Sequence, residues 1–322
     1  MKNIRLFLAL LLATVVTGCG YNVKAINSFK DSSTSFAKSY GDLVAKTDEY
    51  CKEGMRYHYY ADDQYTGEDG VKAQVARCDK YSEGLKSVLI SKTIVSGYAE
   101  ALALTVGIDP AYLDSELSKM GEVVKKLQGR DGTVLFNEAE VNLTTLLAQN
   151  LAQIYLNHKV KEKTLSIIRE NKSLIARHIA IMTKFADDFY DKEHKFLDGA
   201  YQGVESELVF AAVTHSPTAK LTSCTQKPGK PVTCADEKLP LAYLVPHRLL
   251  LHDIVEKRKG LKSGEGAIKE LKTAGSALLV ANEELADKFE ELDKDATLQS
   301  VEEFATKAKA LADAVEKVKG EE

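Results

Sequence analysis

The sequence predicts an all-α protein, an elongated antiparallel helical bundle with one short β-hairpin-like insert. Residues 133–198 form a run of 66 residues without glycine or proline. Between Leu165 and Ala211 apolar residues recur every three or four positions, which is the period of one helix face. Four of the six prolines lie within residues 216–240, so the helix-breaking residues are concentrated in one segment.

The run 133–198 has a polar face, expected to be exposed to solvent, and an apolar face. Polar residues occupy the positions between the apolar ones: Arg177, Lys184, Asp187, Asp188, Asp191 and Lys195. The pattern turns polar near Asn171, a residue that suits a left-handed helix cap. We therefore expect two helices, 138–170 and 172–214, folded back as an antiparallel hairpin, with one continuous helix as the alternative. A helix of about 40 residues is roughly 60 Å long, which predicts an elongated molecule.

The N-terminus has the layout of a secretion signal. Lys2 and Arg5 precede an apolar run from Leu6 to Val16, which is too short to span a bilayer comfortably. The run ends in Val16-Thr17-Gly18-Cys19, and this segment resembles the lipobox of bacterial lipoproteins.

The resemblance implies removal of signal peptide 1–18 and a lipidated N-terminus, residues 19–22. Cys19 would carry diacylglycerol on its sulfur, and the new amino group would be acylated, with palmitate as the typical fatty acid. Several acyl chains together form a stable membrane anchor. Gly20 follows the cysteine in place of an aspartate that would signal inner-membrane retention. We therefore expect lipid anchoring in the outer membrane, facing the periplasm or the cell surface.

The charge balance argues against nucleic-acid binding. Removal of Lys2 and Arg5 lowers the 43 basic residues to 41, against 47 acidic ones. Residues 23–322 read as a single helical domain, in which the most apolar later segment, 85–108, is interrupted by Lys86, Lys92 and Glu100. The expected helices, partly coiled-coil-like in pattern, are 21–58, 71–105, 110–129, 138–170, 172–214, 241–258, 267–292 and 297–319, with loop 61–70, insert 216–240 and a break at 260–266.

Four cysteines remain besides Cys19. In an oxidising compartment an even number indicates disulfide bonds, and three pairings are possible. Cys51 and Cys78 lie almost evenly about loop 61–70, whereas Cys224 and Cys234 lie symmetrically about Gly229, so we expect these two pairs. Four cysteines can also bind zinc, but the chain has no Cys-x-x-Cys spacing.

Candidate catalytic chemistry is sparse. The seven histidines are scattered, and we expect neither a metal nor a cofactor. Glu205-Ser206, followed by Ala212-Val213 and Ala219, resembles the start of the lytic transglycosylase motif, in which glutamate is the general acid at a peptidoglycan glycosidic bond. The family's Gly-Leu-Met-Gln is replaced here by Lys220-Leu221-Thr222-Ser223.

Two loops are candidate partner-binding surfaces. Consecutive ring side chains occur where the first predicted helix ends: Tyr57, His58, Tyr59 and Tyr60, with Tyr65 nearby. Four consecutive residues cannot all face one core, so we expect some of these rings on the surface, where tyrosine is typical of protein interfaces. Local packing near Cys51 and Cys78 is the alternative. Lys227 and Lys230 make the loop 216–240 basic, and loops on rigid scaffolds often carry recognition.

These observations predict a non-catalytic outer-membrane lipoprotein that binds a protein partner in the cell envelope, as an adapter, scaffold or inhibitor. One alternative is a peptidoglycan-cleaving enzyme that uses Glu205. Another is a membrane-inserting helical protein in which residues 88–108 leave the bundle. The sequence does not determine the oligomeric state.

Overall fold

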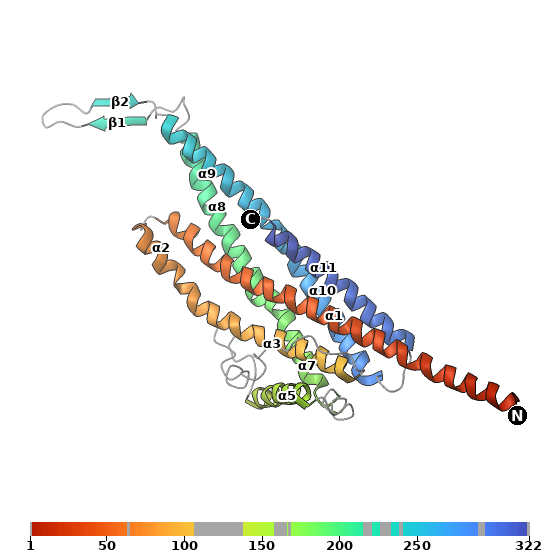
Figure 1. Ribbon diagram of the computed structural model, residues 1–322. Coiled ribbons are helices and arrows are strands. Elements are labelled where there is room, and N and C mark those ends of the chain that lie inside the picture. Colours follow the sequence, from red (N-terminus) through yellow and green to blue (C-terminus); the bar gives the residue numbers. More distant parts are fainter. Residues whose placement is uncertain are drawn as a thin grey trace.

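The computed structural model describes residues 2–62, 65–105, 138–157, 166, 169–214, 221–225, 233–237, 241–288 and 294–320. Side chains are described from Val23 onward, in most of these ranges. The protein is all-α in architecture, and its long helices lie side by side in an elongated bundle (Figure 1).

The central element is α1 (Lys2–Tyr60), a helix of 59 residues. It packs against α3 (Arg77–Thr105), α8 (Asp191–Thr214) and α11 (Lys294–Lys319). The remaining helices are α2 (Glu68–Val75), α5 (Glu138–Asn157), α7 (Lys172–Phe185), α9 (Leu241–Gly260) and α10 (Lys262–Lys288).

The bundle contains both antiparallel and parallel helix pairs, and α1 takes part in both. It runs antiparallel to α3, since Phe29 contacts Tyr98 and Cys51 is bonded to Cys78. It runs parallel to the α7–α8 segment, since Tyr40 meets Phe185 and Tyr57 meets Tyr201. It also runs parallel to α11, since ion pairs join Lys24 to Glu302 and Asp42 to Lys319. Antiparallel packing, as predicted, therefore holds for α1 with α3 and for α8 with α9, but not for α1 with its parallel neighbours.

Aromatic residues form the centre of the core along α1. Phe29 and Phe36 both contact Phe304 of α11, and Tyr40 meets Phe185 of α7 edge to face with centroids 5.2 Å apart. All five side chains are at most 1% exposed. Burial of such rings is the main favourable contribution to stability in a bundle of this kind.

The helix predicted for 172–214 begins at Lys172, as expected. It continues to Thr214 through a π-helical segment, η3 (Ala186–Tyr190), that the sequence pattern did not indicate. Asn171 has a φ of −103° and so does not adopt the left-handed conformation expected of it. Ile175, Ile179, Met182, Phe185 and Phe189 are buried, which confirms the predicted apolar face.

The first part of the central run begins as a helix at Glu138, as predicted, and is described only in part. Helix α5 ends at Asn157, and residues 158–165 lie outside the described part of the chain. The helix packs on α3 as well as on α7, where Thr144 contacts His178. The helix predicted at 110–129 also lies outside the described residues.

Glycines interrupt the C-terminal helices less than their number suggests. A break was expected over 260–266, but α9 ends at Gly260 and α10 begins at Lys262, so only Leu261 separates them. The Leu261 amide still donates to the Lys257 carbonyl, at 3.2 Å. Pro246 lies inside α9, exposed, near its start. The last two helices, expected at 267–292 and 297–319, are 262–288 and 294–319.

Two short strands connect α8 to α9 within the predicted insert. β1 (Leu221–Thr225) pairs antiparallel with β2 (Thr233–Glu237), in a register that places Cys224 opposite Cys234. The side chains of these strands lie outside the described ones, and so does the predicted disulfide. The strands lie at the end of the molecule remote from the N-terminus of α1 (Figure 1).

Cys51 of α1 and Cys78 of α3 form a disulfide, with Cα atoms 6.0 Å apart, which confirms the predicted pair. The bond links the two helices close to the loop that joins α1 to α2. Within the described residues, no helix is both long and apolar enough to cross a bilayer. The predicted signal peptide and Cys19 lie in the part of α1 whose side chains are not described.

Candidate partner-binding surface

The tyrosines singled out in the sequence gather where α1 ends. The rings of Tyr57, Tyr60 and Tyr65 follow one another edge to face, with centroid separations of 5.8 and 6.0 Å. Tyr57 also meets Tyr201 of α8 at 4.9 Å, and Tyr65 meets Tyr59 at 5.6 Å. Edge-to-face contact is the favoured arrangement of aromatic pairs, so each ring helps to fix the next.

Tyr59 is a packing residue within this cluster. Its side chain is 6% exposed, and its hydroxyl accepts a hydrogen bond from the Thr66 amide at 3.0 Å. The same hydroxyl lies 2.9 Å from Thr66 Oγ1. A Cβ atom added at Gly70 would lie 2.2 Å from the Tyr59 hydroxyl, so this glycine permits the close approach. Tyr59 therefore packs locally, as the alternative interpretation of the sequence expected, and is not part of the exposed surface.

Tyr57 links the cluster to α9. Lys257 Nζ donates to the Tyr57 hydroxyl and to Glu53 Oε1, both at 3.1 Å, and lies 5.3 Å from the Tyr57 ring centroid. Burial, together with a hydrogen bond to the Glu53 carboxylate, raises the pKa of the Tyr201 hydroxyl, which stays protonated. Tyr57 is thus held between α8 and α9 and has a defined orientation.

A groove opens beside these rings. It has a volume of about 500 Å³, and we call it the tip groove; its lining residues are Tyr57, Tyr60, Ala61, Asp62, Val204, Glu207, Leu208 and Leu250. Val204 and Leu208 are 8% and 9% exposed and form its floor, whereas Tyr60 and Leu250 remain 46% and 44% exposed. Large apolar side chains left this open beside a concave surface are typical of binding sites.

The other predicted contact residues that the structure describes do not line the tip groove. His58 is exposed, and its ring lies 6.0 Å from that of Phe196. Tyr65 is 49% exposed and borders Tyr60. Lys227 and Lys230 fall in residues 226–232, outside the described part of the chain.

The sequence did not single out the α8 and α9 side of the tip groove. Val204 and Leu208 fall within the apolar face predicted between Leu165 and Ala211 and are buried, but that pattern does not point to Glu207 or Leu250. The run Leu249-Leu250-Leu251 on α9 was the available signal, because three consecutive leucines cannot all face one neighbour.

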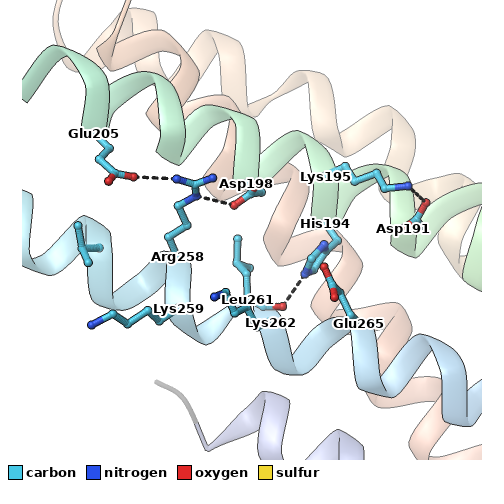
Figure 2. Close-up of a pocket in the computed structure, with 11 residues that line it drawn as sticks. Asp191, His194, Lys195, Asp198, Glu205, Arg258, Lys259, Leu261, Lys262 and Glu265 are labelled. Atoms are coloured by element: carbon cyan, nitrogen blue, oxygen red, sulfur yellow. Dashed lines mark hydrogen bonds and ion pairs between the residues drawn. The ribbon is translucent and has the colours of Figure 1, made fainter.

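A second pocket, of about 410 Å³, lies between α8 and α9 and contains Glu205 (Figure 2). Arg258 Nη1 donates to Glu205 Oε2 at 2.9 Å, and Arg258 Nε donates to Asp198 Oδ1 at 2.8 Å. Lys195 pairs with Asp191 at 2.7 Å on the other side of the pocket. The Glu205 carboxylate is therefore bound to a guanidinium group, and the predicted general acid has an internal partner.

His194 lies at the inner side of the same pocket. It is 5% exposed, and its Nε2 lies 2.6 Å from the Leu261 carbonyl oxygen (Figure 2). Its ring also stacks on that of Tyr190. Asp191 and His194 belong to the pocket, but among the described residues no three His, Cys, Asp or Glu side chains gather as a metal site requires.

His178 is the other buried histidine. It is fully buried on α7 and joins three helices, with its Nδ1 3.1 Å from Ser91 Oγ and its Nε2 3.3 Å from Thr144 Oγ1. Burial, aided by the nearby charge of Arg177, lowers the pKa of His178 from 6.5 to about 3. The neutral imidazole is thus a structural connector between α3, α5 and α7.

The segment proposed as membrane-inserting packs within the core as far as it is described. Val88, Ile94, Val95, Tyr98 and Leu102 are each at most 1% exposed, and residues 106–108 lie outside the described chain. Its insertion would require α3 to separate from α1 and α7, with exposure of this apolar surface.

Comparison with protein-family models, with curated proteins and with solved structures gives no match to this chain.

Proposed function

We propose that this chain is a non-catalytic lipoprotein of the bacterial outer membrane, which binds an envelope protein through the tip groove. The observation that carries the proposal is the groove itself. Tyr60 and Leu250 are about half exposed over a buried apolar floor, and tyrosine-rich apolar surfaces are typical of protein interfaces.

The layout of the chain supports this proposal. The lipobox-like segment ending at Cys19 lies near the N-terminus of α1, whereas Tyr57 and Tyr60 lie in its last turn. At 1.5 Å per residue, about 40 helical residues separate the anchor from the groove by roughly 60 Å. A rigid rod of this length would present the groove well away from the membrane surface.

The hairpin of β1 and β2 lies at the same end of the molecule (Figure 1). We propose that Cys224 and Cys234, which are opposite each other in its register, form a second disulfide. The insert would then be a disulfide-closed β-hairpin, whose basic loop with Lys227 and Lys230 adds contacts to the same partner.

Site-specific photocrosslinking in the bacterium that makes the protein tests this proposal. A photoreactive phenylalanine analogue at Tyr60 should capture a specific envelope protein. The same analogue at Val280, which is 53% exposed on α10, is the matched control and should capture none. The captured protein is then purified, and its affinity for the wild-type chain is measured. Crosslinks that are equal at both positions, or absent from both, would reject a partner site at the groove.

The anchor is tested separately. We expect metabolic labelling with an alkyne-bearing palmitate analogue to mark the wild-type protein and not a Cys19→Ser variant. Labelling that persists in the variant would exclude Cys19 as the acylated residue. Separation of inner and outer membranes then determines which membrane contains the labelled protein.

A further inference from the structure

The apolar lining of the tip groove suits the stem of a long side chain. Its floor, Val204 and Leu208, is apolar and nearly covered, and Leu250 forms one wall. Lysine and arginine side chains lay their aliphatic stems along surfaces of this kind while the charged head stays near water.

The aromatic wall is suited to a positive charge. The rings of Tyr57 and Tyr60 are nearly perpendicular, at 87° with centroids 5.8 Å apart, so that they present differently oriented surfaces to the groove. Ring faces attract cations through their quadrupole. The molecule already uses this contact internally, because Lys257 Nζ lies 5.3 Å from the Tyr57 centroid and Lys46 Nζ lies 5.8 Å from that of Tyr50.

The charged side chains that line the tip groove are acidic. Among the residues that the structure describes, the charged ones that line it are Asp62 and Glu207, and none is basic. The C-terminus of α1 adds the negative end of a helix dipole at the same place. Glu207 is exposed and forms no ion pair among the described residues, whereas Glu205 in the neighbouring pocket is paired with Arg258.

We propose that the tip groove binds a lysine or arginine side chain of the protein partner. The stem of that side chain lies along Val204, Leu208 and Leu250, and its charged head is bound between the tyrosine rings and the carboxylate of Glu207. This inference deepens the proposed function and rests on it for the source of the side chain.

Methyl NMR on the full chain, labelled at leucine and valine, tests the subsite without the partner. The charged probe is Nα-acetyl-lysine methylamide, in which the side-chain ammonium group is free. The uncharged probe is Nα-acetyl-norleucine methylamide. The lysine derivative should perturb the methyl signals of Val204, Leu208 and Leu250. We expect an initial titration slope about two- to fivefold larger than that of the norleucine derivative, as a single cation–π contact at an exposed site implies.

Two variants identify the charge that matters. Glu207→Gln should lower the lysine slope without abolishing its excess over norleucine, because it removes a carboxylate, keeps the shape and leaves the contact with the tyrosine rings in place. Glu303→Gln, on the exposed face of α11, is the control and should change nothing. Equal slopes for the two probes, no response to either, or an unchanged slope in Glu207→Gln would overturn the assignment.

The subsite and the partner can fail separately. A partner captured at Tyr60 that binds Glu207→Gln and wild type equally would retain the proposed function and reject the basic side chain. A selective response to the lysine probe without any captured partner would retain the subsite and reject the proposed function.

Discussion

The rings of Tyr57 and Tyr201 meet edge to face, with centroids 4.9 Å apart and planes inclined at 74°. This contact joins the last turn of α1 to α8, two helices that run parallel. It sets the inner wall of the tip groove, because Tyr57 lines the groove directly and is held from behind by Tyr201 and Lys257. The wall that α1, α8 and α9 form is therefore fixed by helix packing, and Ala61 and Asp62 border the groove just beyond the end of α1.

The disulfide between Cys51 and Cys78 should stabilise this end of the bundle. It closes a loop with a sequence separation of 27 residues, for which the chain-entropy model gives about 3.5 kcal/mol. We expect the double variant Cys51→Ser/Cys78→Ser to lose roughly this free energy of unfolding in urea titrations. Cys224→Ser/Cys234→Ser serves as the comparison, and an unchanged midpoint in the first variant would contradict the structural role of the bond.

His178 should make the fold sensitive to acid. Its pKa is near 6.5 in the unfolded chain and falls to about 3 in the folded protein, so below pH 6.5 the unfolded state binds the extra proton. Stability is therefore present above pH 6.5 and declines as the pH falls toward 3, by at most about 1.4 kcal/mol per unit.

The variant His178→Leu removes this titration. Its free energy of unfolding should be lower at pH 7, because Ser91 and Thr144 lose their partner, and should decline less steeply between pH 6.5 and pH 4. Parallel pH profiles for the variant and the wild type would show that burial of His178 does not cause the acid sensitivity.

Gly264 allows α10 to approach the π-helical segment. A Cβ atom at this position would lie 2.8 Å from His194 Cδ2 and 3.0 Å from the Tyr190 hydroxyl. Gly264→Ala should therefore destabilise the protein by about 1–3 kcal/mol, through overpacking. Gly266→Ala is the matched control, since nothing lies within 4 Å and helix propensity favours alanine. Equal stabilities of the two variants would refute the close contact.

Glu205 offers a test against the enzymatic alternative. The Glu205 carboxylate is bound to Arg258. We therefore expect the purified wild-type protein to release no soluble glycan from peptidoglycan, and Glu205→Gln to behave identically. The substitution should cost about 1 kcal/mol or less in stability, because both partners are partly exposed. Glycan release by the wild type that the substitution abolishes would establish catalysis.

The local pattern of the chain predicted much of the fold. The three-to-four-residue spacing of Ile175, Ile179, Met182 and Phe185 identified the buried face of α7, and the symmetry of Cys51 and Cys78 identified their bond. The buried His178 and His194 were not foreseen, because their burial depends on Ser91 and on the Leu261 carbonyl, which lie far away in the sequence.

The sequence predicted the α1 side of the tip groove but not its α8 and α9 side. Consecutive ring side chains at 57–60 indicated a surface, but the sequence could not show that Tyr59 turns inward to Thr66 while Tyr60 stays open. Nor could it place Glu207 and Leu250 beside Tyr60, since that depends on how α8 and α9 pack beyond the end of α1.

The affinity of the crosslinked partner for surface variants tests the central claim most directly. The claim predicts that Tyr60→Ser and Leu250→Ser each weaken binding about tenfold or more, as truncation of interface anchors does, while Val280→Ser leaves it unchanged. Equal affinities for all three variants and the wild type, measured by calorimetry on folded proteins, would contradict it.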